Sequence, residues 1–134
     1  FSSLVQKLSL ENKFLFLGKL SSVDFELKQS DIVVVPSIWG DACPSTISEA
    51  LACGKPLVAT RVGGVPELVG DAGAALLVEP NSPELLADSL EKLIKYPKIR
   101  KELSSKARAR AIAALNEEQY HSKVISSLFD LILK

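Results

Sequence analysis

The sequence has little of several residue types that mark particular classes of protein. Its 134 residues include two cysteines and one histidine, and aromatic residues make up 6%. Cys43 and Cys53 lack the spacing of a metal site, so we expect reduced thiols and a cytoplasmic protein. No run approaches the roughly 20 apolar residues that a membrane-spanning helix needs. A net charge of zero with so few aromatic residues argues against nucleic-acid binding.

Charge is balanced overall but unevenly distributed along the chain. Residues 1–91 carry six Lys and Arg against twelve Asp and Glu, whereas residues 92–134 carry ten against four. Most of this basic excess lies between Lys92 and Arg110. One interpretation is the solvated face of a helix. The other is a patch that contacts a partner or anionic lipid, which would place the protein at the inner face of the membrane.

Short apolar runs alternate with helical stretches along the first part of the chain. The pattern predicts strands at 14–17, 32–35, 57–60 and 74–78. It predicts helices at 22–29, 45–53, 66–69, 98–113 and 117–133, and a further helix that begins at Pro83. Because the strands are apolar throughout, we predict an α/β fold: a Rossmann-like parallel sheet with flanking helices. Ligands of such sheets bind beyond the carboxyl ends of the strands, which directs attention to the loops 18–21, 36–45 and 60–66.

Single residues predict where three of these helices begin or end. Pro44 suits the first helical position before Ser45, and Gly54 suits the position just past the end of the same helix. Ser82 is expected to cap the next long helix, with Pro83 at its first position. The buried face of that helix is predicted from helical spacing to carry Leu86, Leu90, Leu93 and Ile94.

The loop 36–45 follows the central predicted strand and leads into a helix. Free N–H groups at a helix start, together with the helix dipole, favour an anion such as a diphosphate, and the amides of Ser45 and Thr46 are the expected donors. Asp41 and Glu49 lie eight residues apart on the loop and the helix. Such carboxylates accept hydrogen bonds from the vicinal hydroxyls of a sugar or a ribose. The alternative is that Asp41 caps the helix and Glu49 is solvated.

The stretch that begins at Pro36, PSIWGDACPSTISEALACGKPLVATRVGGVPELV, resembles the signature of GT4-type retaining glycosyltransferases of the GT-B fold. That signature has Pro-Ser, an acidic residue, seven intervening residues, Glu-Ala and later Gly-Gly-x-Pro-Glu. The resemblance reaches back to Phe16-Leu17-Gly18 and forward to the helices near 83–133. It implies a C-terminal, nucleotide-sugar-binding domain of an enzyme that transfers a sugar from a nucleoside-diphosphate sugar with retention, without a metal or other cofactor.

The resemblance also implies roles for individual residues. Asp41 takes the place of the first acid, the catalytic residue that lies against the donor sugar, and Glu49 takes the place of the acid that binds the ribose hydroxyls. Leu20 corresponds to the loop that packs on the nucleobase. The chain departs from the family pattern in two places. Asp41 stands where the family normally has Glu, which shortens its reach by about 1.5 Å. Cys43 and Pro44, also expected to bind the donor, replace aromatic-Gly and stiffen the loop.

Members of this family neutralise the donor diphosphate with an Arg and a Lys earlier in the same domain, and no lysine before residue 36 stands in that context. We therefore expect residues 1–134 to be a donor-binding domain that is truncated at its N-terminal side and inactive without the N-terminal acceptor domain of the same protein. The alternatives are a related sugar-nucleotide enzyme, such as an epimerase, and a non-catalytic binding domain of the same fold. Two further assignments stay open: Gly63-Gly64 shapes the sugar site or makes a structural turn, and Trp39 walls the sugar pocket or packs in the core.

Overall fold

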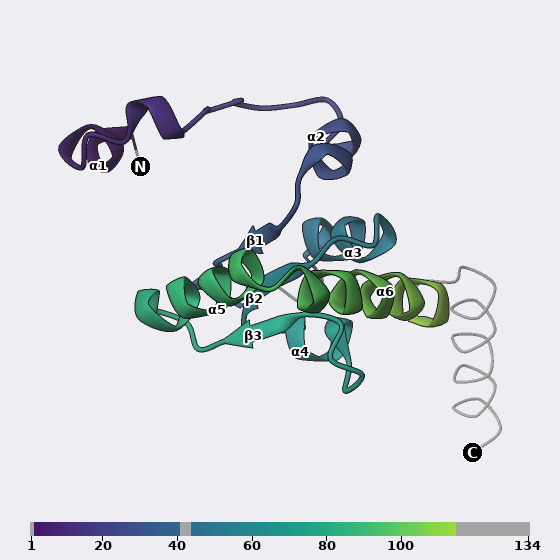
Figure 1. The fold of residues 1–134 in the computed structure, drawn as a ribbon. Helices are drawn as coiled ribbons and strands as arrows, with labels where there is room; N and C mark the ends of the chain where they lie inside the picture. Colours follow the sequence, from purple (N-terminus) through teal and green to yellow (C-terminus); the bar gives the residue numbers. More distant parts are fainter. Residues whose placement is uncertain (1, 41–43, 115–134) are drawn as a thin grey trace, which may run out of the picture.

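The computed structural model describes residues 2–40 and 44–114, and its centre is a three-stranded parallel sheet (Figure 1). The strands are β1 (Val33–Val35), β2 (Leu57–Thr60) and β3 (Leu76–Val78), in the order β1-β2-β3. Val35 lies opposite Ala59, and Thr60 lies opposite Val78, so the carboxyl ends of all three strands meet at one edge.

Helices precede, connect and follow these strands. They are α1 (Ser2–Lys7), the short 3-10 helix η1 (Glu11–Lys13), α2 (Asp24–Gln29), α3 (Ser45–Ala52), α4 (Val65–Val69), α5 (Pro83–Lys95) and α6 (Pro97–Ala114). The predicted helices at 22–29, 45–53, 66–69 and 98–113 are thus confirmed within a few residues. The predicted helix at 117–133 lies outside the described residues.

β2, the middle strand of the described sheet, is buried on both faces by these helices, whereas β1 lies at its edge with Val34 37% exposed, so the prediction that 32–35 is the central strand is wrong. Successive residues of a strand point to opposite faces, and all four residues of β2 are buried. Leu57 and Ala59 share a core cluster with residues of α3, α4 and α6, whereas Val58 packs with Val78 and with Leu93 of α5. This two-sided burial explains the uninterrupted apolar run of β2 and confirms the predicted parallel sheet with flanking helices.

The predicted strand at 14–17 is wrong. These residues form no strand, and their side chains are exposed, Leu15 to 82%. The rings of Phe14 and Phe16 stack on each other with centroids 6.3 Å apart. A strand needs a neighbour to pair its backbone N–H and C=O groups. No strand of the described chain lies beside this segment, which runs apart from the sheet in Figure 1.

The ends of α3 and α5 correct two further predictions. Pro44 is the N-cap of α3 rather than its first helical residue, and its carbonyl accepts from the Ile47 amide at 3.0 Å. Gly54 does follow the end of α3 as predicted, and it adopts a left-handed conformation with φ 62°. Ser82 occupies the N-cap of α5, but its hydroxyl donates to the Pro80 carbonyl at 3.3 Å and forms no cap bond.

The buried face of α5 is narrower than predicted. Leu86, Leu90 and Leu93 pack against β2 and β3 as expected, whereas Ile94 is 65% exposed. At 100° per residue, Ile94 lies about 80° around the helix from Leu86. The prediction for Ile94 is therefore wrong because the sheet covers only the narrower stripe.

The basic stretch of the sequence ties α6 to three other helices. Arg100 donates to the Leu93 and Ile94 carbonyls, Arg108 donates to the Ala52 carbonyl, and Arg110 donates to the Glu67 and Leu68 carbonyls. These acceptors lie at the C-terminal ends of α5, α3 and α4, where unpaired carbonyls and the helix dipole both favour a cation. Lys95 and Lys106 form ion pairs with Glu91 and Glu102 along their own helices. Many of the basic side chains in this stretch therefore form hydrogen bonds or ion pairs with other residues of the chain.

Candidate functional site

Three loops meet at the carboxyl edge of the sheet. They follow β1, β2 and β3, and two of them are the predicted ligand loops 36–45 and 60–66. A cavity of about 150 Å³ lies between them and is lined by Pro36, Ile38, Thr60, Val78, Glu79, Asn81, Ser82, Pro83 and Leu86. The structure thus brings the two predicted loops together at the edge where parallel sheets bind ligands.

The start of α3 carries the predicted anion site. Pro44 is half-buried, and Ser45 and Thr46 are exposed at the first helical positions. No acceptor from the described part of the chain lies on the amides of Ser45 and Thr46, and Ile47 is the first helix residue whose amide pairs with a described carbonyl. Both amides lie at the helix start without a described acceptor, and their role as donors to an anion stays a prediction.

Glu49 lies one turn further along α3. Its side chain is half-buried and makes no ion pair or side-chain hydrogen bond with any other described residue. Its backbone carbonyl accepts from the Cys53 amide at the end of the helix. The carboxylate is thus held on a fixed backbone without a partner among residues 2–40 and 44–114. Asp41 and Cys43 lie outside the described residues, so their predicted roles stay predictions.

Three other predicted positions have different outcomes. Leu20 is half-buried in the segment between η1 and α2, which Figure 1 draws apart from the sheet, so its predicted place beside a nucleobase stays a prediction. Trp39 is 80% exposed, so its interpretation as a core residue is wrong. Gly63 has φ 50°, a left-handed conformation that favours glycine, whereas Gly64 has φ −81°.

Thr60 is a site residue that the sequence analysis did not single out. It ends β2, is 4% exposed, and is the one buried polar side chain of the described chain. Its hydroxyl donates to the Ser37 carbonyl at 2.5 Å, in the loop that leads to α3. A hydroxyl at the end of a wholly apolar strand is the signal that marks this position in the sequence.

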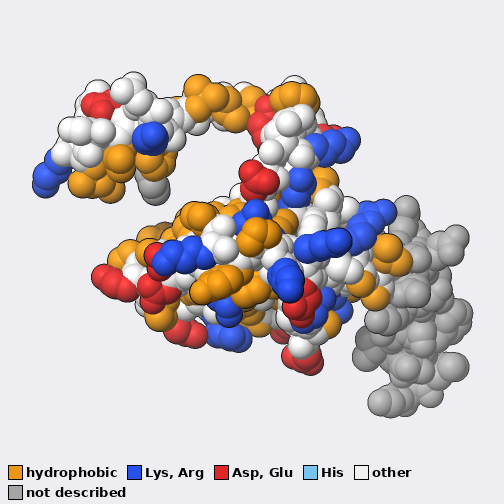
Figure 2. All heavy atoms as spheres, in the orientation of Figure 1, with side chains coloured by type: hydrophobic (Ala, Val, Ile, Leu, Met, Phe, Trp, Pro, Cys, Tyr) orange, Lys and Arg blue, Asp and Glu red, His pale blue; other side chains and the backbone are white. Residues whose placement is uncertain are grey.

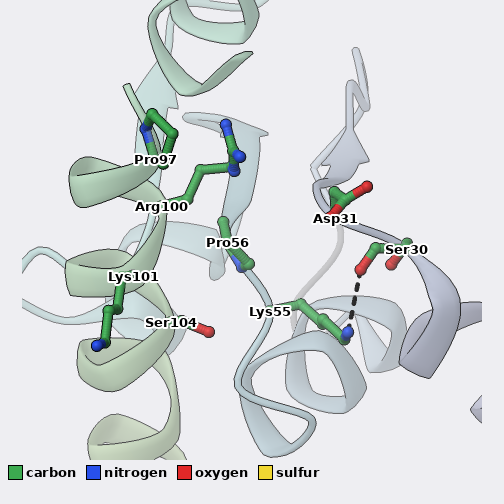
Figure 3. Close-up of a pocket in the computed structure, with 8 residues that line it drawn as sticks. All are labelled: Ser30, Asp31, Lys55, Pro56, Pro97, Arg100, Lys101 and Ser104. Carbon is green, nitrogen blue, oxygen red and sulfur yellow. Dashed lines mark hydrogen bonds between the residues drawn. The ribbon is translucent and has the colours of Figure 1, made fainter. Parts of the chain in front are cut away.

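A larger cavity of about 320 Å³ lies at the opposite edge of the sheet, where β1 and β2 begin (Figure 3). Figure 3 shows Lys55 pointing toward Ser30, and its ammonium donates to the Ser30 and Lys28 carbonyls at 3.0 and 2.7 Å. Arg100 is engaged with the end of α5, and Asp31 adds a carboxylate to the wall. Because Lys55 and Arg100, two of its three cations, already form contacts within the fold, this cavity is not the candidate site.

Neither a metal site nor a membrane-spanning helix is present in the described part of the chain. No group of three His, Cys, Asp or Glu side chains in residues 2–40 and 44–114 is arranged to hold a metal ion. None of the described helices combines the length and the apolar character that crossing a membrane requires.

Comparison with protein families gives a match over most of the chain. Residues 1–110 match the family Glycosyl transferases group 1. The N-acetyl-alpha-D-glucosaminyl L-malate synthase of Bacillus anthracis is 32% identical over 129 residues, which is 96% of this chain and 32% of that protein.

Solved structures extend the likeness to the fold. The Anabaena protein Alr3699/HepE, in complex with UDP, superposes with a TM-score of 0.89 at 26% identity, over 96% of this chain and 35% of that one. The same protein in complex with UDP-glucose gives a TM-score of 0.86. The C-terminal domain of a glycosyl transferase group 1 family protein (LpcC) from Francisella tularensis gives 0.74 at 27% identity, over 87% of this chain and 60% of that one. This chain spans about a third of the length of the longer relatives.

Proposed function

The chain belongs to the glycosyl transferases group 1 family, and we propose that it is the nucleotide-sugar-binding domain of a retaining glycosyltransferase. The observation that carries the proposal is the superposition of this sheet and its helices on a protein whose structure contains UDP-glucose. The start of α3 supports it, because two amides without described partners and one half-buried carboxylate are presented beyond the carboxyl ends of parallel strands.

The proposed mechanism gives each predicted residue one task. The Ser45 and Thr46 amides bind the donor diphosphate, whose negative charge grows as the bond to the sugar breaks. Glu49 accepts hydrogen bonds from the ribose hydroxyls and so fixes the nucleoside. Asp41 accepts a hydrogen bond from a donor-sugar hydroxyl beside the reacting carbon. Because the Asp41 side chain is short, this contact is longer than that of a glutamate, or a water molecule bridges the two groups.

Cys43, Pro44 and Leu20 complete the proposed donor site. Cys43 and Pro44 shape the turn before α3, and Leu20 packs on the nucleobase when the donor binds. The amides at α3 stabilise the leaving diphosphate without a metal ion, so we propose a metal-independent transfer with retention.

The acceptor site belongs in this proposal to the N-terminal domain of the same protein. Closure of two domains over the donor would exclude water and align the acceptor with the sugar. In this proposal residues 1–134 supply the donor-binding site, and they should have no transferase activity alone. Sugar transfer by the isolated residues 1–134 would contradict this assignment.

Calorimetric titration of the full-length protein with UDP, GDP and ADP tests the donor site. We expect one nucleotide to bind best and Glu49→Gln to weaken that nucleotide about 10-fold, because the variant removes a charge-assisted hydrogen bond. The control is Glu91→Gln on α5, where Glu91 pairs with Lys95. Failure of all three nucleotides to bind would contradict the proposal, as would equal binding by the Glu49→Gln and wild-type proteins.

We also propose a cytoplasmic protein that contacts the inner face of the membrane through the turn between α5 and α6. The α5–α6 corner consists of Lys92, Ile94, Tyr96, Lys98 and Lys101. Ile94 and Tyr96 are 65% and 56% exposed, and the three lysines form no ion pair within the described chain. Figure 2 shows Lys and Arg side chains beside hydrophobic ones over α5 and α6. The free thiol of Cys53 fits a reducing compartment.

Sedimentation with lipid vesicles tests the α5–α6 corner. The full-length protein should bind vesicles that contain phosphatidylglycerol better than vesicles of phosphatidylcholine alone, and added salt should weaken binding. The triple variant Lys92→Glu, Lys98→Glu and Lys101→Glu should lose this binding. The matched control carries Lys7→Glu, Lys13→Glu and Lys19→Glu. Equal binding by both triple variants would contradict the assignment of the corner.

A further inference from the structure

We propose that Thr60 is a positioning residue, which holds the loop before α3 in the shape that receives the donor. This inference rests on the proposed function, because that loop carries Asp41 and leads directly to the amides of Ser45 and Thr46. Thr60 itself lies on β2 and acts through the loop rather than on the donor.

The contact joins two segments that are 23 residues apart in sequence. The Thr60 hydroxyl donates to the Ser37 carbonyl at 2.5 Å and lies 3.4 Å from the Val35 carbonyl at the end of β1. Thr60 is 4% exposed, so water does not compete freely for this bond. The hydroxyl therefore fixes the direction in which the chain leaves β1.

The two amides that follow β2 donate to other carbonyls. The Arg61 amide donates to the Val78 carbonyl at 2.8 Å, on the side of β3, and the Val62 amide turns back to the Thr60 carbonyl at 3.0 Å. The ladder between β1 and β2 ends at the pair Val35 and Ala59. Ser37 is half-buried, and the Thr60 hydroxyl is the donor to its carbonyl among the described residues, so removing that hydroxyl leaves the carbonyl without a described partner.

A second contact ties the other end of the same short segment. A Cβ built on Gly40 would lie 3.4 Å from the Cα of Gly63, so the two backbones touch. Gly63 adopts φ 50°, which favours glycine and turns the chain toward Gly40. Residues 37–40 are thus held at one end by the Thr60 hydroxyl and packed at the other against Gly63.

Removing the Thr60 hydroxyl should weaken nucleotide binding and not only slow the transfer step. In Thr60→Val the loop samples other shapes, and the measured affinity falls with the fraction of molecules in the binding shape. Loss of one net hydrogen bond corresponds to about a 3- to 10-fold higher Kd for the nucleotide. The KM for the donor should rise by a similar factor, whereas Thr60→Ser, which keeps the hydroxyl, should stay within about twofold of wild type.

The test uses the full-length protein, calorimetry with UDP, GDP and ADP, and hydrogen exchange of the amides before and at the start of α3. We expect Thr60→Val to raise the Kd of the nucleotide that binds and to speed exchange at residues 38–46. Val58→Ala is the control, because Val58 is fully buried in β2 on the α5 side. It should lower the melting temperature without changing the Kd.

The outcomes separate this inference from the proposed function. If wild type binds a nucleotide and Thr60→Val binds it equally well with unchanged exchange, the positioning role is overturned and the proposed function stands. An equal rise in Kd for Val58→Ala would also overturn it, since general destabilisation would then explain the effect. If wild type binds none of the three nucleotides, the proposed function fails, and Thr60 has no donor to position.

Discussion

The guanidinium of Arg110 lies directly against Gly70. A Cβ built on Gly70 would be 2.9 Å from Arg110 Cζ, which is closer than non-bonded carbon atoms approach. From this position Arg110 Nε donates to the Leu68 carbonyl at 2.9 Å, at the end of α4. Gly70 also has φ 68°. Glycine in the turn after α4 therefore suits both its left-handed backbone and the position of the Arg110 guanidinium, which a Cβ would displace from its hydrogen bonds.

We predict that Gly70→Ala destabilises the protein more than Gly73→Ala. Gly73 has a similar φ of 67° but open space around it, so alanine there adds only backbone strain, about 1 kcal/mol. At Gly70 the clash with Arg110 adds about 1 to 2 kcal/mol more. Thermal unfolding of the single variants measures the difference. In an Arg110→Ala background the two glycine variants should become equal, and an unchanged difference would contradict the role of Arg110.

We predict that alanine substitution at two adjacent residues of α5 changes stability by very different amounts. Leu93→Ala should cost about 2 to 5 kcal/mol, because Leu93 is fully buried against β2 and β3. Ile94→Ala should change stability by less than about 0.5 kcal/mol, because its side chain is largely in solvent. Denaturant unfolding of both variants checks this contrast. A large loss in Ile94→Ala would show that the side chain is covered in the full-length protein.

We predict that Asp41→Asn lowers the kcat/KM for sugar transfer about 10- to 100-fold, through loss of a charge-assisted hydrogen bond to the donor. Asp41→Glu should keep most of the activity, because it restores the carboxylate with the usual reach. Asp31→Asn, at the opposite edge of the sheet, is the matched control. An unchanged rate in Asp41→Asn would argue against a role for this carboxylate in sugar transfer.

We predict a pH response at Glu102 that leaves stability almost unchanged. The hydrogen bond and the positive charge of Lys106 hold the pKa of the Glu102 carboxyl below its usual range. A lowered folded-state pKa gives stability that is present above the unfolded pKa and is lost as pH falls through the folded pKa. Both side chains are exposed, so this contribution is small. An NMR titration should show the Glu102 pKa rising in Lys106→Ala, with the melting temperature unchanged.

Local pattern was enough to predict the elements that are buried on both sides. The apolar run of β2 and the glycine at 54 after α3 are signals within a few residues, and both are confirmed. The segment 14–17 has the same apolar pattern as a strand, but its pairing depends on a neighbour that local pattern cannot show.

Contacts between distant segments were the part that sequence could not supply. In the sequence Thr60 is the last residue of a predicted strand, and only the structure shows the Ser37 carbonyl beside its hydroxyl. The sequence shows only a charged helix face at Arg100, Arg108 and Arg110. Their carbonyl acceptors on α5, α3 and α4 are determined by packing, which sequence spacing does not reveal.

The position of α6 in the chain has a consequence for synthesis on the ribosome. Arg108 is 56 residues after Ala52, the carbonyl acceptor at the end of α3. At about 5 to 20 residues per second, α3 is made several seconds before the side chain that caps it. During that interval the ends of α3 and α4 are open to chaperones and proteases, and the emergence of α6 should be the step that closes this nascent domain.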